Sequence, residues 1–197
     1  MLQLAASSST LINNDMKQLL SVIVILTLLA GGVYLFFLAP GAQTASVSDA
    51  ASEHHSKYPP REVPQGSKEF RSDLYGFSLL YPSDLTAKLI DEGSGAATVT
   101  FENDKTIEGF QIFIVPFDGA QITDDRFKKD IPLGVRKNIQ NITIDGATGA
   151  SFFSEDATLG ETAEVWFIRG GYLYEVNTFK DRAEWLSSIM SSWKFLE

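Results

Sequence analysis

A predominantly apolar stretch runs from Gln18 to Ala39 and contains no charged residue. As a helix rising ~1.5 Å per residue it would measure about 33 Å, which is enough to cross the hydrocarbon core of a bilayer. Pro40 and Gly41 then end such a helix. A buried core helix is rarely apolar on every face over such a length. The pattern therefore predicts a transmembrane anchor at residues 18–39, with the lipid bilayer as a partner.

The positive charges around this stretch predict its orientation. Lys17 directly precedes it, and the next lysine or arginine is Lys57. Because Lys and Arg favour the cytoplasmic side, residues 1–17 are expected to form a short cytoplasmic N-terminus, with the rest of the chain outside the cytoplasm. The stretch is longer than the roughly 7–15 apolar residues of a secretory signal, which favours a retained anchor (an uncleaved signal) over a cleaved one. Whether it is cleaved, and whether translation starts at Met1 or Met16, stays open.

The residue pattern changes twice beyond the predicted anchor. Residues 40–66 are rich in Ala, Ser and Pro without a sustained apolar period, which predicts a flexible linker. Residues 67–197 consist of short apolar runs separated by turn residues, which predicts one extracytoplasmic domain. The first runs predict strands at Tyr75–Pro82, Leu85–Ile90, Ala96–Glu102 and Gly109–Phe117.

The Gly109–Phe117 run is apolar at consecutive positions, which is typical of a central strand covered on both faces. The next two patterns along the chain are helical. Thr123–Asp130 is predicted to be a short helix, since Thr123 can cap it and its aspartates and lysines suit opposite ends of the helix dipole. Gly134–Gln140 is predicted to form a second helical turn.

The C-terminal third predicts a bend or bulge, a hairpin and a helix. Asn141–Asp145 and Ala150–Ser154 bracket a predicted bend or bulge at residues 146–149. Thr162–Arg169 and Tyr172–Phe179 flank a Gly170-Gly171 turn and are predicted to form a hairpin. A helix is expected from about Arg182 to Ser192, with Asp181 and Glu184 as a capping box. Its apolar face is made of Leu186, Ile189, Met190 and Trp193. The fold class is α+β, an antiparallel sheet covered by helices and preceded by one transmembrane helix.

The composition of the chain argues against several classes of function. The net charge of −9 makes a nucleic acid an improbable partner, because phosphate binding needs basic residues. The chain has no cysteine, so thiolate catalysis, cysteine-ligated zinc and disulfides are excluded. Its only histidines, His54 and His55, fall in the predicted linker without other ligands at metal-binding spacing. No catalytic, cofactor-binding or metal-ligating residue is assigned, and the chain is expected not to be an enzyme.

Three weaker candidates for functional sites have simpler explanations. The acidic pairs Asp91/Glu92, Glu102/Asp104, Asp124/Asp125 and Glu155/Asp156 lack calcium-loop spacing, so solvated turns are favoured over metal ligands. Tyr172 with Tyr174, and Trp166 with Ile168, form two rows that could line a ligand groove, but a core role is favoured. Asn141-Ile142-Thr143 fits a glycosylation sequon, a short match that is common by chance.

Four motifs near the two ends of the predicted domain together resemble a known superfamily. Residues 75–82, YGFSLLYP, resemble the opening of PsbP-like proteins, and EVWFI at 164–168, GGYLYE at 170–175 and SWKF at 192–195 resemble their ending. The resemblance spans about residues 70–197. It implies an α/β/α sandwich around an antiparallel sheet, export, and docking to larger partners without a shared enzymatic activity. The metal-binding histidines of some members have no counterpart in residues 67–197.

These observations favour a binding or scaffolding module of the bacterial cell envelope, held at the membrane and docking to an envelope protein whose identity the sequence does not reveal. The ligand-binding residues and the oligomeric state are equally undetermined. A small-ligand carrier with an aromatic-lined cleft is the first alternative. A hydrolase that uses carboxylates alone is the second, and it would need two acidic residues to converge in one pocket with a perturbed pKa.

Overall fold

The computed structural model describes residues 61–106, 108–131, 135–156 and 160–196. The predicted cytoplasmic N-terminus, the predicted anchor at residues 18–39, most of the predicted linker, and both histidines lie outside these residues. Within the described ranges, no helix combines the length and the apolar character needed to span a membrane.

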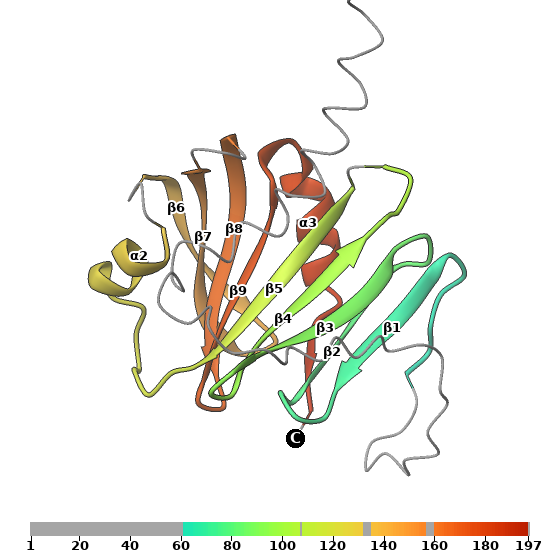
Figure 1. Cartoon of the computed structure of the whole chain (residues 1–197), viewed down its shortest axis with the longest axis horizontal. Helices are drawn as coiled ribbons and strands as arrows, with labels where there is room; N and C mark the ends of the chain where they lie inside the picture. The colour runs from blue at the N-terminus through green and yellow to red at the C-terminus, as the bar shows by residue number, and fades with distance from the viewer. Residues whose placement is uncertain (1–60, 107, 132–134, 157–159, 197) are drawn as a thin grey trace, which may run out of the picture. The chain divides into compact units, whose positions relative to one another are not determined.

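The domain consists of two antiparallel sheets and a few short helices (Figure 1). The small sheet has the strand order β1-β2-β10, and the large sheet has the order β3-β4-β5-β9-β8-β7-β6. The elements in chain order are β1 (Ser67–Ser72), β2 (Phe77–Pro82), β3 (Thr86–Gly93), β4 (Ala96–Glu102), β5 (Gly109–Pro116), α2 (Asp124–Asp130), β6 (Arg136–Ile144), β7 (Ala147–Asp156), β8 (Gly160–Arg169), β9 (Tyr172–Phe179), the 3-10 turn η2 (Lys180–Arg182), α3 (Ala183–Met190) and β10 (Lys194–Phe195).

Most of the predicted elements are confirmed. β4 has the predicted bounds, and β2, β3 and β5 differ from the predictions only at their ends. β5 is a central strand, because β4 pairs with one of its edges and β9 with the other. Its Phe110, Ile112 and Ile114 are buried on the face that carries the main core. α2 begins after Thr123, whose hydroxyl accepts a hydrogen bond from the Arg126 amide, as predicted.

Two tight turns organise the C-terminal hairpins. Gly170 and Gly171 have φ angles of 61° and 82° and join β8 to β9, with Arg169 opposite Tyr172. This is the predicted glycine turn, in which positive φ at both positions matches the twist of the strands. The bend predicted at residues 146–149 is instead a two-residue turn at Asp145-Gly146, and the prediction was wrong for Ala147–Gly149, which belong to β7.

The second predicted helical turn is wrong. Of the predicted Gly134–Gln140 segment, residues 136–140 belong to strand β6. The register between β6 and β7 shifts between Lys137 and Gln140, and Asn138 has a φ of 56°, which places a β-bulge there. The extra residue interrupts the regular alternation of a strand at this point, so the first half of β6 lacks the pattern by which a strand is recognised.

The C-terminal helix is confirmed, but its capping box is not. α3 begins at Ala183 because Lys180–Arg182 forms a 3-10 turn before it, and the side chain at the N-cap position, Arg182, makes no capping hydrogen bond. The predicted apolar face is correct, since Leu186, Ile189, Met190 and Trp193 are all buried.

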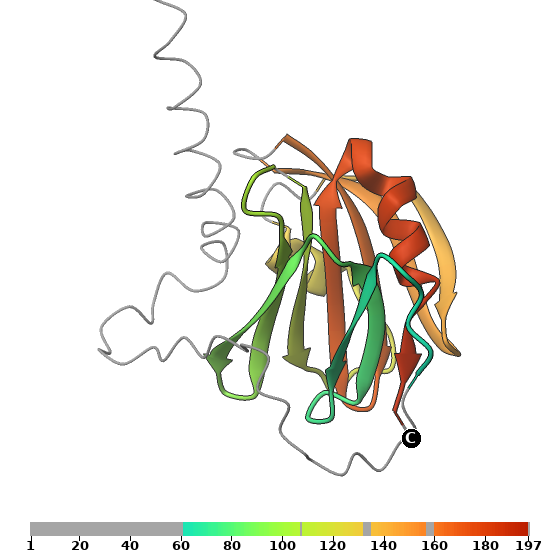
Figure 2. The same cartoon turned by 90° about the vertical axis from the view of Figure 1, so that its right-hand side faces the viewer.

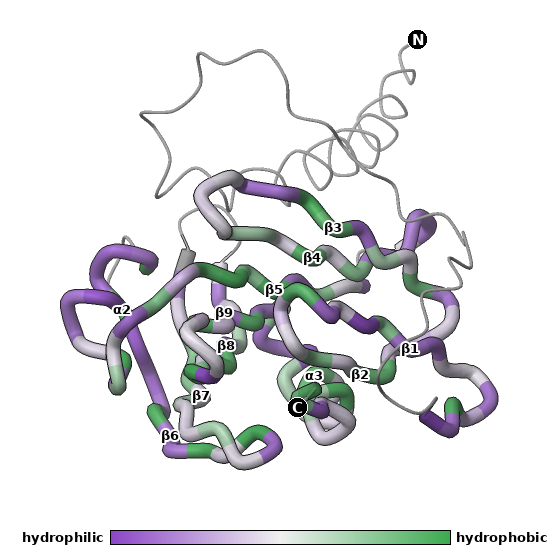
Figure 3. Tube along the Cα trace, turned by 90° about the horizontal axis from the view of Figure 1, so that it is seen from below, coloured by the Kyte–Doolittle hydropathy of each residue, from purple (hydrophilic) through white to green (hydrophobic). Residues whose placement is uncertain are grey.

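The two sheets form layers with the helices. Figure 3 shows the strands of the large sheet following an arc from β3 to β6, with α3 and β2 on its inner side and α2 on its outer side. Figure 2 shows α3 and the small sheet beside each other. The main core lies between the large sheet, the small sheet and α3, and a second cluster lies under α2. The expected single sheet covered by helices is thus corrected to two sheets, because β1, β2 and β10 cover part of the inner face themselves.

Hydrogen bonds join the two ends of the domain. The Tyr174 hydroxyl in β9 donates to the Tyr75 carbonyl at 2.6 Å. The Ser192 hydroxyl accepts from the Leu80 amide at 2.8 Å and lies 3.2 Å from the Leu80 carbonyl. Ser192 therefore satisfies the backbone of β2 at a point that the short strand β10 does not reach. Arg61 adds a further bond from its guanidinium to the Ser192 carbonyl at 2.6 Å.

Candidate functional site: a groove between α3 and the β6–β8 strands

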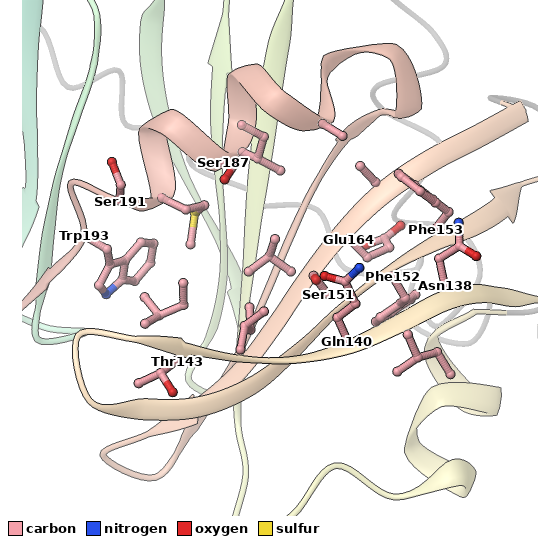
Figure 4. Close-up of a pocket in the computed structure, with 18 of the residues that line it drawn as sticks. Asn138, Gln140, Thr143, Ser151, Phe152, Phe153, Glu164, Ser187, Ser191 and Trp193 are labelled. Atoms are coloured by element: carbon pink, nitrogen blue, oxygen red, sulfur yellow. The ribbon is translucent and has the colours of Figure 1, made fainter.

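A half-open groove of about 740 Å³ lies on the inner face of the large sheet, between α3 and strands β6 to β8 (Figure 4). α3 covers this face only in part, so the last strands of the sheet extend beyond the helix. The lining is Asn138, Ile139, Gln140, Ile142, Thr143, Ile144, Asp145, Ser151, Phe152, Phe153, Ala163, Glu164, Val165, Ala183, Leu186, Ser187, Met190, Ser191, Trp193 and Lys194.

The helical wall of the groove follows one stripe of α3. Its lining residues stand at positions 183, 186, 187, 190 and 191, which is the spacing of a single helical face. Leu186 and Met190 are buried at the base of this wall, whereas Ser187 and Ser191 are exposed at its rim. The stripe therefore contributes its large residues to the core and its small polar residues to the lining of the groove.

The floor is formed by alternate residues of the sheet. Ile142 and Ile144 in β6 and Val165 in β8 are half-buried and lie on the side facing α3. Between them β7 approaches β8 closely at Gly149, where an added Cβ would lie 2.3 Å from the Trp166 carbonyl oxygen. The floor is thus apolar and firmly packed at its centre.

One end of the groove is closed by a polar clamp. Asp145, in the β6–β7 turn, accepts hydrogen bonds from the Lys194 ammonium and from the Phe195 amide, each at 2.8 Å. Partial burial raises the pKa of Asp145, but the bonds from Lys194 and Phe195 outweigh it, so that the pKa is lowered. The clamp fixes the turn against the C-terminal strand β10.

The second carboxylate of the lining is also held in place. Glu164 is buried and accepts hydrogen bonds from Ser154, Thr162 and Trp166 at 2.8, 2.7 and 3.2 Å. These donors stabilise it as a structural acceptor within the sheet. Neither lining carboxylate is therefore positioned as a general base.

A different pair of carboxylates does converge, on the opposite face of the sheet. Arg126 of α2 forms ion pairs with Asp130 and with Glu175 of β9, the latter at 3.0 Å, and all three side chains are nearly buried. Burial, together with the neighbouring Asp130, raises the pKa of Glu175 well above its ordinary value, although Arg126 opposes the rise. Because the guanidinium bridges both carboxylates and none of the three lines the groove, the cluster attaches α2 to the sheet.

Several members of the acidic pairs named from the sequence form turn contacts or ion pairs. Asp91 accepts a bond from the Gly93 amide within its hairpin, and Asp124 pairs with Arg136 at 2.8 Å. Glu155 pairs with Lys137 at 3.3 Å. The described residues contain no group of three or more metal-ligating side chains. The remaining contacts join Glu102 to Lys88 and Asp125 to Lys128.

The aromatic rows of the β8–β9 hairpin fill two cores. Tyr174 stacks on Phe167 with ring centroids 5.1 Å apart, and Trp166 stacks on Phe127 of α2 at 4.9 Å. Tyr174 and Trp166 are almost fully buried. The favoured interpretation of these rows as core is confirmed, and the groove lies elsewhere, beside α3.

The comparisons with known proteins concern the fold. No family model matches the sequence, and no curated protein sequence matches it. The structure is similar to the solution structure of cyanobacterial PsbP (CyanoP) from Synechocystis sp. PCC 6803, with a TM-score of 0.47 and 18% sequence identity. The match covers 71% of this chain and 98% of that chain. At 18% identity the likeness concerns the fold alone.

Sequence reasoning missed the groove and the Arg126 cluster for different reasons. The groove joins β6 to α3, elements about 40 residues apart whose proximity no local pattern encodes. The cluster left a signal in the sequence, because Glu175 is a charged residue within the mostly apolar segment Tyr172–Val176. A carboxylate at such a position requires a cationic partner from another element.

Proposed function

We propose that this chain is a membrane-anchored, extracytoplasmic binding or scaffolding module of the bacterial cell envelope, which holds a protein partner in the groove between α3 and β6–β8. The uncharged segment at residues 18–39 supports the anchor and the position of the domain outside the cytoplasm. The observation that carries the proposal is the groove itself, an apolar floor left uncovered in a domain whose other large apolar side chains are mostly buried.

The chemistry of the groove favours binding over catalysis. Its floor is aliphatic, its rim carries hydroxyl and amide side chains, and both of its carboxylates are engaged by internal donors. An apolar centre with a polar rim is typical of the surfaces at which proteins associate. Binding at such a surface requires no cofactor, and the proposal includes none.

Matched variants of α3 test the site. Ser187 is exposed and lines the groove, whereas its neighbour Ser188 is exposed and does not line it. Ser187→Arg should place a long charged side chain in the groove and abolish recovery of a reproducible partner by pull-down from detergent-solubilised membranes. Ser188→Arg should leave that recovery unchanged. Equal recovery by both variants would exclude the groove as the site.

The anchor is tested separately by alkaline extraction of membranes. The intact chain should remain in the membrane fraction after the wash, since about twenty apolar residues hold it there. Its appearance in the soluble cytosolic fraction would contradict the anchor and leave the groove untouched.

The volume of the groove favours one alternative, a small-ligand carrier. About 740 Å³ lies within the range of roughly 300–1,000 Å³ that is common for small-molecule sites. Native mass spectrometry of the purified chain should then show a bound apolar molecule that Ser187→Arg displaces. A single unliganded mass would count against the carrier and in favour of a protein partner.

A further inference from the structure

The strand β6 is an edge of the large sheet, and its outer side carries no strand among the described residues. Residues 138–144 of this strand, NIQNITI, contain no charge, no proline and no glycine. They are largely exposed, and Ile139 keeps 52% of its surface accessible. Proteins usually protect such an edge with charged residues, because unpaired backbone groups invite another strand.

The opposite edge of the same sheet shows that protection. β3 carries Lys88 at its centre and Asp91 and Glu92 near its end, and its register also shifts at a bulge. In β6 the charged residues Arg136 and Lys137 and the bulge at Asn138 all lie near the start of the strand. Beyond the bulge, Gln140–Ile144 pairs regularly with β7 and presents a straight, uncharged edge.

The register identifies which backbone groups of β6 face outward. The two-residue turn makes Ile144 and Ala147 the pair next to the turn, and such a pair exchanges both backbone hydrogen bonds. Bonded and non-bonded pairs alternate along antiparallel strands, so Ile142 and Gln140 also bond to β7. The N–H and C=O groups of Asn141 and Thr143 therefore point away from the sheet.

We propose that this edge is the docking site of an extended segment of a partner protein, which joins the large sheet beside β6. The outward groups of Asn141 and Thr143 supply its main-chain hydrogen bonds, and the groove receives its alternate apolar side chains. The inference rests on the proposed function, because it names the kind of partner that the groove accepts.

Charge determines the kind of segment that fits. Residues 67–197 contain 13 Lys and Arg against 21 Asp and Glu, a net charge of −8. Arg136 and Lys137, which begin β6, are already paired with acidic side chains. A segment with basic residues at its ends is therefore favoured over an acidic one. The same charge disfavours a second copy of this chain as the occupant, since two such domains repel each other.

A library of random peptides displayed on phage provides the probe, selected on the full chain purified in detergent. The enriched peptides should alternate apolar and polar residues and carry Lys or Arg at their ends. Thr143→Pro removes one outward N–H at an edge position, where proline is tolerated. It should weaken binding of the enriched peptides about tenfold or more, whereas Thr143→Val, which keeps the N–H, should not. Circular dichroism verifies that both variants are folded.

Hydrogen exchange on the unaltered protein gives a second readout that needs no variant. Addition of an enriched peptide should slow exchange of the Asn141 and Thr143 amides, because these donors become bonded. The absence of enrichment, unchanged exchange at both amides, or equal binding to Thr143→Pro would overturn the inference. Binding lost in Ser187→Arg but kept in Thr143→Pro would overturn strand addition while supporting the groove as the site. Self-association of the chain that Thr143→Pro abolishes would overturn the choice of a different protein as the occupant.

Discussion

The ion-pair cluster between α2 and the sheet contains a single cation, Arg126, and its removal is the sharpest test of the packing described above. The Arg126 side chain is 11% exposed and lies between Asp130 and Glu175, which are 13% and 8% exposed. Arg126→Met preserves most of the side-chain volume and removes the charge. Two carboxylates would then face each other in a site with little access to water.

The expected effect is large relative to the stability of the domain. Removing one partner of a buried ion pair costs about 3–5 kcal/mol, because the remaining charge stays buried without compensation. The total free energy of unfolding of a domain is about 5–15 kcal/mol. Arg126→Met should therefore lower the free energy of unfolding by about a fifth or more. Part of this loss should disappear at acidic pH, where a carboxyl group of the cluster can bind a proton.

Urea unfolding followed by circular dichroism measures this change. The double variant Arg126→Met/Glu175→Gln supplies the control, because it leaves only Asp130 charged in the cluster. We expect it to recover at least about half of the loss, since neighbouring charges in one network do not act additively. A loss below about 1 kcal/mol for Arg126→Met, or no recovery in the double variant, would refute the reasoning.

Three further predictions address other contacts. Burial raises the pKa of Glu175 in the folded state, so stability should fall as the pH rises from about 4.3 toward that raised pKa, and Glu175→Gln should remove this slope in pH-dependent unfolding. Ser192→Ala should cost about 1–3 kcal/mol in chemical denaturation because backbone groups of β2 lose their partner, whereas Ser191→Ala should change little. In thermal melts, Gly149→Ala should lower stability by about 1–3 kcal/mol or more because its Cβ would collide with the backbone of β8. In the same melts, Gly146→Asn should change stability by no more than about 0.5 kcal/mol, because the site is open and has a φ that asparagine tolerates.

Local sequence patterns predicted the fold correctly where the conformation of an element depends on its own residues. The alternation within Ala96–Glu102 and the glycine pair at residues 170–171 encode a strand and a turn directly, and both were predicted correctly. β6 was mispredicted because one extra residue at Asn138 shifts the phase of its side chains. The capping box failed for a related reason, since a 3-10 turn moved the start of α3 past Asp181.

The candidate site was beyond local signals. The small residues Ser187 and Ser191 read as ordinary polar positions of a surface helix, and only their position opposite β6 makes them a groove wall. The unprotected edge at residues 138–144 is visible in the sequence as a charge-free run. It becomes meaningful only once the sheet order shows that this run is at an edge rather than inside the sheet.

The small sheet has a consequence for how the molecule is made. Its middle strand, β2, is completed by β10 and by Ser192, which lies 112 residues from its partner Leu80. A nascent chain that still lacks them cannot close this sheet or finish the main core, because contacts so distant in sequence form late. We therefore expect β2 to pair only with β1 until the segment that carries β10 has been synthesised.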